Sequence, residues 1–279
     1  MTWVALAWLG AAGATAWGLH SLDRYVAEGQ PDVECRLEWT SLPPWLEGPD
    51  GERALDEIAA AADLRADDDF HAPTLCERVG TNLRQSPWVA DVHRVVKQPR
   101  GIVRIEASFR EPFAYVETYG RAYLVDETGV RLPPACSAAS LRPADAFVIT
   151  GVFEAVPEVG QPWEGDDLAA GLRLVRFLRN AAAQGRLTFR AWVKAIDVAN
   201  FDGRERPIDG KLRLRTILPR CYINWGEAPG EEFPIDASAD RKLELLRVYY
   251  NEHGGQFPDG WVCDVRGPDG VRRWEYTGG

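Results

Sequence analysis

The residue types that most often carry catalysis or bind metals are few and scattered in this chain. The four histidines are His20, His71, His93 and His253, and no two of them are close in sequence. His71 and Cys76 could supply two metal ligands, but no second pair follows at a spacing that would complete a tetrahedral site. The sequence therefore predicts no metal centre.

Acidic residues offer two further candidates for chemistry. Asp67 to Asp69 form an acidic run, but the spacing of a calcium-binding EF-hand loop is absent, so a solvated helix-capping turn is expected. Glu231 and Glu232 lie among Gly and Pro residues, which is typical of an exposed loop. The spacing of carboxylates in the sequence does not by itself exclude a hydrolase with an unfamiliar site. Motifs for a nucleophile elbow, a P-loop, a zinc protease and a dinucleotide-binding turn are absent. We therefore expect neither an enzyme nor a cofactor or small-molecule substrate.

Composition indicates a globular protein of one or two domains. The 279 residues are 46% hydrophobic and 27% charged, with a net charge of -10. This acidic balance argues against a nucleic-acid binder, which normally presents a basic face. The cysteines are odd in number and lack a CxxC pair, so no disulfide pairing is assigned. They are Cys35, Cys76, Cys136, Cys221 and Cys263.

The N-terminal segment is long and apolar. Residues 3–19 carry no charge and would form about 25 Å of helix, close to the thickness of a bilayer core. A cleaved signal peptide is the main alternative, because the residues at 14–16 are Ala-Thr-Ala, and a buried core helix is a third. The absence of a basic start and the length of the apolar run favour a transmembrane helix. We expect residues 1–22 to anchor the chain in a membrane.

Helix and strand patterns organise the rest of the chain into two parts. The first part, residues 32–112, should be a small α/β domain with the order strand, helix, helix, strand, strand. Its expected elements are a strand within 32–46, helices at 54–64 and 73–85, and a strand at 103–110. The second part, residues 113–279, should be a mixed α+β domain with a mainly antiparallel sheet. Its expected helices are 166–185, with Asp166 or Asp167 as the N-cap, and 241–252, with Ser238 as the N-cap. Its expected strands are 113–118, 121–125, 147–151, 191–199, 211–216, 220–225, 261–266 and 271–276.

Several short motifs in this order resemble the extracytoplasmic part of the FtsQ/DivIB cell-division proteins. Each motif is weak alone, but together they cover most of the chain from about residue 67 to residue 276. They are Pro-Trp-Val at 87–89, Arg-Glu-Pro-Phe-Ala at 110–114, Leu-Val-Asp with Gly-Val at 124–130, the run at 147–151, Ile-Asn-Trp-Gly at 223–226 with Lys-Leu at 242–243, and Val-Cys-Asp-Val-Arg at 262–266 with Gly-Val at 270–271.

The resemblance implies an architecture and a function. Residues 32–112 would be a POTRA-type domain and residues 113–279 an FtsQ-type β domain, held at the bacterial inner membrane with the soluble body outside the cytoplasm. The protein would be a septum-assembly scaffold of the divisome that binds bitopic FtsB/FtsL-like proteins. An edge of the POTRA-type domain would recruit upstream division proteins. The alternatives are a POTRA-containing envelope assembly or secretion factor and a soluble secreted binding protein.

Partner binding is expected at the last strand of the sheet, because the edge of a sheet can pair with a strand from another protein. Trp274 and Tyr276 could be anchors and Arg266 a charge partner, although the two aromatic residues could instead fill the core of the sheet. Trp88 is expected in the core. The predicted partner-binding residues are Val262, Asp264, Arg266, Gly270, Val271, Trp274 and Tyr276, and Arg110, Glu111 and Pro112 are predicted to form the joint between the domains.

Overall fold

The computed structural model describes residues 33–134 and 146–276, which group into two compact units. The smaller unit comprises residues 33–42, 56–85 and 91–108, and the larger unit comprises the remaining described residues. The predicted anchor at 1–22 and Cys136 lie outside the described residues. Each unit is presented separately.

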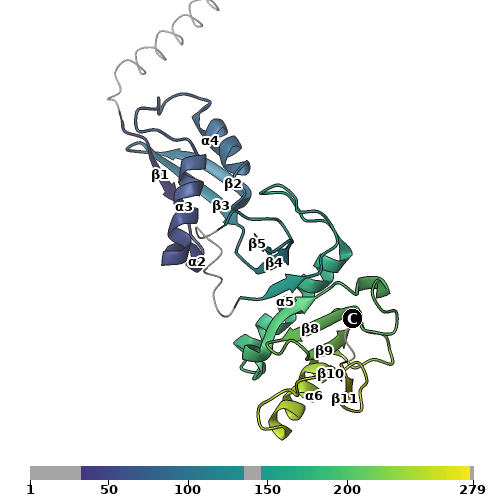
Figure 1. The fold of residues 1–279 in the computed structure, drawn as a ribbon. Helices are drawn as coiled ribbons and strands as arrows, with labels where there is room; N and C mark the ends of the chain where they lie inside the picture. The colour runs from purple at the N-terminus through teal and green to yellow at the C-terminus, as the bar shows by residue number, and fades with distance from the viewer. Residues whose placement is uncertain (1–32, 135–145, 277–279) are drawn as a thin grey trace, which may run out of the picture. The chain divides into compact units, whose positions relative to one another are not determined.

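The smaller unit is built on a three-stranded sheet (Figure 1). The sheet has the order β1 (Arg36–Trp39), β3 (Ile102–Phe109), β2 (Val89–Gln98), and β1 runs parallel to β3. Along β3 the side chains alternate, so that Val103 and Ile105 are buried while the residues between them are not. One face of the sheet is therefore available to cover a core.

Helices supply the other half of that core. They are α3 (Pro49–Ala61), which starts in the larger unit, and α4 (Leu75–Arg84); the short α2 (Pro44–Glu47) belongs to the larger unit. Leucine and valine recur along α4 at a spacing of four residues, which places them on one side of the helix. The buried residues of this unit include Ile58, Ala62, Leu75, Val79, Leu83, Val92, Val103 and Ile105.

The larger unit contains a mixed eight-stranded sheet with the order β11-β10-β9-β8-β7-β6-β4-β5. Among the seven neighbouring pairs of this sheet, four are antiparallel and three are parallel. The two ends of this order are β11 and β5. The strands are β4 (Ala114–Thr118), β5 (Arg121–Val125), β6 (Val148–Thr150), β7 (Val193–Asp197), β8 (Leu212–Thr216), β9 (Tyr222–Gly226), β10 (Trp261–Asp264) and β11 (Arg272–Glu275).

Two long helices share one hydrophobic core with this sheet. These are α5 (Asp166–Ala183) and α6 (Ala239–Glu252). The ring of Phe177 on α5 lies 5.9 Å from that of Trp225 on β9, and Gly171 brings α5 close to Ile149 of β6. The core thus extends from the strands near β4 to those near β10.

The predicted α+β class is confirmed, and the four long helices begin or end within a few residues of their expected bounds. Ser238 caps α6 as predicted, because its side chain accepts a hydrogen bond from the Arg241 nitrogen. The predicted caps of α5 are wrong: the N-cap is Gly165, with φ 128°, and Asp166 and Asp167 lie in the first turn. The predicted order includes two strands after the helices, but no bounds were predicted for the ten-residue strand β2. It lacks a regular alternation of buried and exposed residues.

Candidate functional site

The residue types that could carry catalysis lie apart in the part of the chain that the structure describes. His71 lies in a turn before α4, His93 lies in β2 beside Asp91, and His253 stacks on Tyr249 at the end of α6. Among the described residues, no three His, Cys, Asp or Glu side chains gather in a way that could hold a metal ion.

The acidic run at 67–69 forms a turn held by basic residues. Asp68 accepts a hydrogen bond from the Arg65 nitrogen at 2.8 Å and pairs with Arg78 of α4 at 2.7 Å. These two interactions lower the pKa of Asp68. The helix-capping role expected for the run is wrong, since the N-cap of α4 is Thr74 and no side chain caps it.

The edge of the large sheet is formed by β11, the strand on which partner binding was predicted. Among the described strands, β11 pairs only with β10, in an antiparallel register that sets Trp274 opposite Val262. All four residues of β11 are exposed. A sheet edge of this kind presents backbone N–H and C=O groups that a strand from another protein can pair with.

Val262 and Asp264 lie one strand further in, on β10. This strand pairs with β11 on one side and with β9 on the other, so its backbone groups are used within the sheet. Both side chains are buried. The structure therefore places these two predicted residues one strand behind the edge, with buried side chains, and their role towards a partner stays a prediction.

Arg266 follows β10 and binds its own chain. Its guanidinium donates hydrogen bonds to the Asp264 carboxylate, from Nη2 at 2.7 Å and from Nε at 3.1 Å. Its Nη1 donates to the carbonyl oxygen of Ile208 at 2.8 Å. The hydrogen bonds that Arg266 donates to the Asp264 carboxylate raise the pKa of Arg266. These bonds fix the end of β10 to the loop that contains Ile208, while the predicted role of Arg266 towards a partner stays a prediction.

The aromatic residues predicted as anchors take different positions. Trp274 is 36% exposed, so the alternative that it fills the core of the sheet is wrong. Tyr276 is half-buried, and its ring packs edge-on against Tyr222 of β9 with the centroids 6.0 Å apart. Gly270 and Val271 lie in the segment that leads into β11, and Val271 packs partly on the core. Trp274 is thus the most accessible large apolar side chain on the predicted site.

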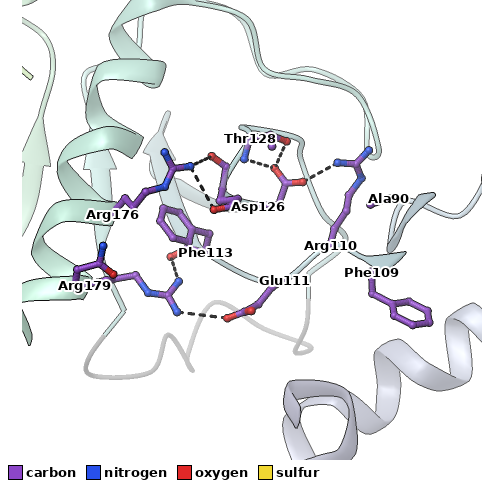
Figure 2. A pocket seen from close by; sticks show the side chains of 11 residues that line it. Ala90, Phe109, Arg110, Glu111, Phe113, Asp126, Thr128, Arg176 and Arg179 are labelled. Carbon is purple, nitrogen blue, oxygen red and sulfur yellow. Dashed lines mark hydrogen bonds and ion pairs between the residues drawn. The ribbon is translucent and has the colours of Figure 1, made fainter. Parts of the chain in front are cut away.

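The residues predicted as a domain joint lie between β3 and β4, and two of them, Arg110 and Glu111, line a cavity of about 540 Å³ in the larger unit (Figure 2). Arg110 donates from Nη1 to the buried carboxylate of Asp126 at 2.8 Å. Asp126 also accepts hydrogen bonds from Thr128 and from the Val130 nitrogen, which closes the turn after β5. Trp88 is buried, as predicted. The sequence indicated the turn but gave no signal for the Arg110 contact.

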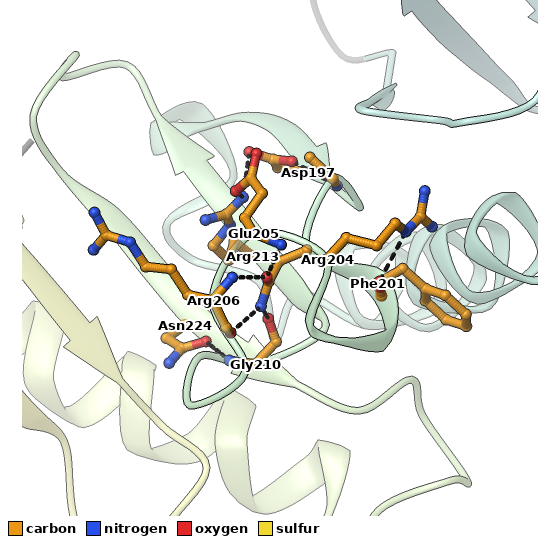
Figure 3. A network of polar contacts seen from close by, with 10 residues as sticks. Asp197, Phe201, Arg204, Glu205, Arg206, Gly210, Arg213 and Asn224 are labelled. Carbon is orange, nitrogen blue, oxygen red and sulfur yellow. Dashed lines mark hydrogen bonds and ion pairs between the residues drawn. The ribbon is translucent and has the colours of Figure 1, made fainter. Parts of the chain in front are cut away.

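A polar network holds the loop between β7 and β8, and sequence reasoning missed it (Figure 3). Asn200 is fully buried, and its Nδ2 donates to the carbonyl oxygens of Arg206 and Gly210, both at 3.0 Å. Its Oδ1 accepts from the nitrogens of Glu205 and Arg206. The Gly210 nitrogen in turn donates to Asn224 of β9 at 2.8 Å. The loop is therefore bound to the sheet through side chains that lie far apart in the sequence.

Ion pairs reinforce the same loop. Arg213 of β8 contacts Asp197 at 3.4 Å and Glu205 at 2.5 Å, and Arg204 reaches the buried carboxylate of Asp167 at 2.7 Å. Burial alone would lower the pKa of Arg213, but Asp197 and Glu205 outweigh it and raise that pKa. These contacts connect β7 and β8 with the loop, and the loop with α5.

Lys242 of α6 is a buried charge that the sequence motif did not explain. Its side chain is fully buried, its Nζ lies 5.5 Å from the centre of the Trp225 ring, and it makes no hydrogen bond within the described part of the chain. Burial lowers the pKa of Lys242, although nearby carboxylates, of which Glu232 and Asp236 act most strongly, work in the opposite direction. The lysine therefore costs stability at neutral pH.

Comparisons with known proteins give the sequence no family. No protein-family model matches it, and no curated protein matches it at a significant level. In the structure, none of the helices between residues 33 and 134 or between 146 and 276 is long and apolar enough to cross a membrane.

Proposed function

We propose that this protein is a bacterial cell-division scaffold of the FtsQ/DivIB type. An N-terminal helix within residues 1–22 would anchor it in the inner membrane, and its two extracytoplasmic units would bind other proteins of the divisome during septum assembly. The partners would be bitopic proteins of the FtsB/FtsL kind. No catalytic step is part of this proposal.

The observation that carries the proposal is the exposed edge strand β11. It is the last strand of a large sheet, it is exposed along its whole length, and it presents Trp274 beside an open backbone edge. Addition of a partner strand would satisfy the backbone groups of this edge and bury the indole ring. Aromatic residues of this kind often supply much of the binding energy of an interface.

The arrangement of the smaller unit supports the same proposal. Its elements follow the order β1, α3, α4, β2, β3, which is the order expected of a POTRA-type domain. Most motifs of the larger unit that suggested the family fall on the turn after β5 and on β6, β9 and β10, while Lys-Leu at 242–243 falls on α6. They therefore lie mostly on strands and turns of one sheet, as they would in the proposed β domain.

Site-specific photo-crosslinking in living cells tests the proposal. A photoreactive amino acid placed at Arg272 or Glu275 of β11 should yield an adduct with a small single-pass membrane protein of the division machinery. The matched control is Arg121 at the start of β5, the strand at the opposite end of the sheet. No adduct from β11, or the same adduct from both ends of the sheet, would contradict the proposed binding edge.

A further inference from the structure

The cavity beside β4 and α5 lies near the end of the sheet order opposite to β11 and carries three arginines. Its volume of about 540 Å³ falls in the range of ligand-binding clefts, and all its lining residues belong to the larger unit. The arginines are Arg110, Arg176 and Arg179. Three carboxylates accompany them, so what matters is how firmly each arginine is held.

Arg110 is held firmly. Its 2.8 Å contact with Asp126 has the length of a charge-assisted hydrogen bond, and the Asp126 side chain is only 5% exposed. Asp126 accepts three further hydrogen bonds, all on Oδ1, so four donors hold this carboxylate in place. This pair is a structural part of the cavity wall.

Arg176 and Arg179 are held loosely. Arg176 contacts the carboxylate of Glu127 at 3.3 Å and donates to its carbonyl oxygen at 3.4 Å. Arg179 contacts the carboxylate of Glu111 at 3.5 Å and donates to the carbonyl oxygen of Phe113 at 3.3 Å. The two carboxylate distances exceed the roughly 2.7–2.9 Å that is usual for charge-assisted hydrogen bonds. The side chains of Glu127 and Glu111 are 62% and 58% exposed, so solvent competes for them. Exposed pairs of this kind contribute about 0–1 kcal/mol and are easily exchanged.

Phe113 separates these two arginines. In Figure 2 its ring lies between their guanidinium groups, whose central carbons are 6.0 Å and 4.7 Å from the ring centre. The cavity therefore offers two cationic positions, one on each side of an aromatic ring. Alternate side chains of an extended peptide are about 7 Å apart, so two carboxylates on one segment could each reach one guanidinium.

We propose that this cavity binds an acidic peptide segment of a partner protein, whose carboxylates replace those of Glu111 and Glu127 on Arg179 and Arg176. The two glutamates show that carboxylates fit these positions, and their loose contacts leave them free to be displaced. The site is distinct from the β11 edge and does not depend on the proposed function.

Fluorescence anisotropy with a labelled synthetic peptide tests the site on the full chain. The probe alternates glutamate with glycine, and its control replaces each glutamate by glutamine. Replacing both arginines, Arg176→Gln with Arg179→Gln, should weaken binding of the acidic probe by about tenfold or more, since hydrogen bonds to charged groups are lost. The matched control is Arg173→Gln, on the same helix outside the cavity, where it pairs with Glu231. It should leave binding unchanged.

Two variants that should bind more tightly show that weaker binding of the arginine variants does not come from a loss of folding. Glu111→Gln and Glu127→Gln each remove a competing carboxylate and should tighten binding by about twofold. Three results would overturn the proposal: no binding of the acidic probe, equal binding of the glutamine probe, or equal binding to the double arginine variant. Equally tight, arginine-dependent binding of inorganic pyrophosphate would assign the cavity to small anions instead, and would also overturn it.

Discussion

Substitution of Asp126 by asparagine should strongly destabilise the larger unit. The carboxylate accepts four hydrogen bonds of 2.8–2.9 Å, two from Thr128, one from the Val130 nitrogen and one from Arg110. An asparagine oxygen can keep the bonds to the turn, but its NH₂ group would face the Arg110 guanidinium, donor against donor. The variant thus removes the charge partner of a largely buried arginine without removing the turn.

The size of the effect follows from the burial of the pair. Breaking one side of a buried ion pair costs about 3–5 kcal/mol. The Arg110 side chain is 23% exposed and can be partly rehydrated, so we expect a loss of about 2–3 kcal/mol in the free energy of unfolding. For a unit of this size the midpoint of thermal unfolding should fall by about 4–12 °C.

Urea unfolding followed by tryptophan fluorescence measures this loss. Thr128→Val is the matched control, because it removes one hydroxyl donor to the same carboxylate and should cost about 1 kcal/mol. Arg110→Gln and the double variant with Asp126→Asn complete a cycle, in which the two losses should be less than additive by about 1–3 kcal/mol. An Asp126→Asn variant within 0.5 kcal/mol of the natural protein, roughly the spread of neutral surface changes, would refute the reasoning.

Three further predictions concern other parts of the larger unit. Lys242→Met should raise the free energy of unfolding by about 1–3 kcal/mol at pH 7, because a buried unpaired charge is removed. The folded-state pKa of Lys242 lies below 10.5, so between that pKa and pH 10.5 the unfolded natural chain binds more protons than the folded one. The natural protein therefore gains stability as the pH rises through this range, and the stability difference between it and Lys242→Met should shrink. Gly151→Ala should lower the free energy of unfolding by about 2–4 kcal/mol, because φ is 82° and a Cβ would lie 2.6 Å from the backbone nitrogen of Ala199. Gly185→Ala is the control: φ is 68° but the space around it is open, so the loss should be about 1 kcal/mol. Trp274→Ala should weaken partner binding by about tenfold or more, because an aromatic anchor supplies much of the binding energy of an interface. The free energy of unfolding should change little, because the side chain is exposed.

Each of these predictions has a result that contradicts it. A stability difference for Lys242→Met that stays constant from pH 7 to pH 10.5 would show that the lysine is not desolvated in the folded state. Equal losses for the two glycine variants in denaturant titrations would refute the close approach at Gly151. For Trp274 the control is Ile217→Ala, another exposed apolar residue outside β11, and equal weakening of binding by both variants would remove Trp274 from the interface.

The helices were largely predictable because their signals are local. The spacing of Leu75, Val79 and Leu83 defines one face of α4, and Ser238 caps α6 through a bond to a residue three positions later. The start of α5 was predicted at residue 166, but its cap was misassigned, because aspartates favour both the cap and the first turn and the N-cap is Gly165.

The candidate site was only partly predictable because its geometry depends on pairings between distant segments. The sequence indicated a final strand with Trp274, but it carries no signal that β10 is paired on both sides, and Val262 and Asp264 were therefore included among the partner-binding residues. The contacts of Arg110 with Asp126 and of Asn200 with its loop likewise arise only once the chain is folded.

Localisation in the cell tests the central claim most directly. A fluorescent protein fused to the N-terminus of the full chain should appear as a band at the division site, and membrane fractionation of the same cells should recover the fusion in the membrane fraction. A signal in the soluble fraction, or one spread evenly around the envelope, would contradict the division-scaffold function.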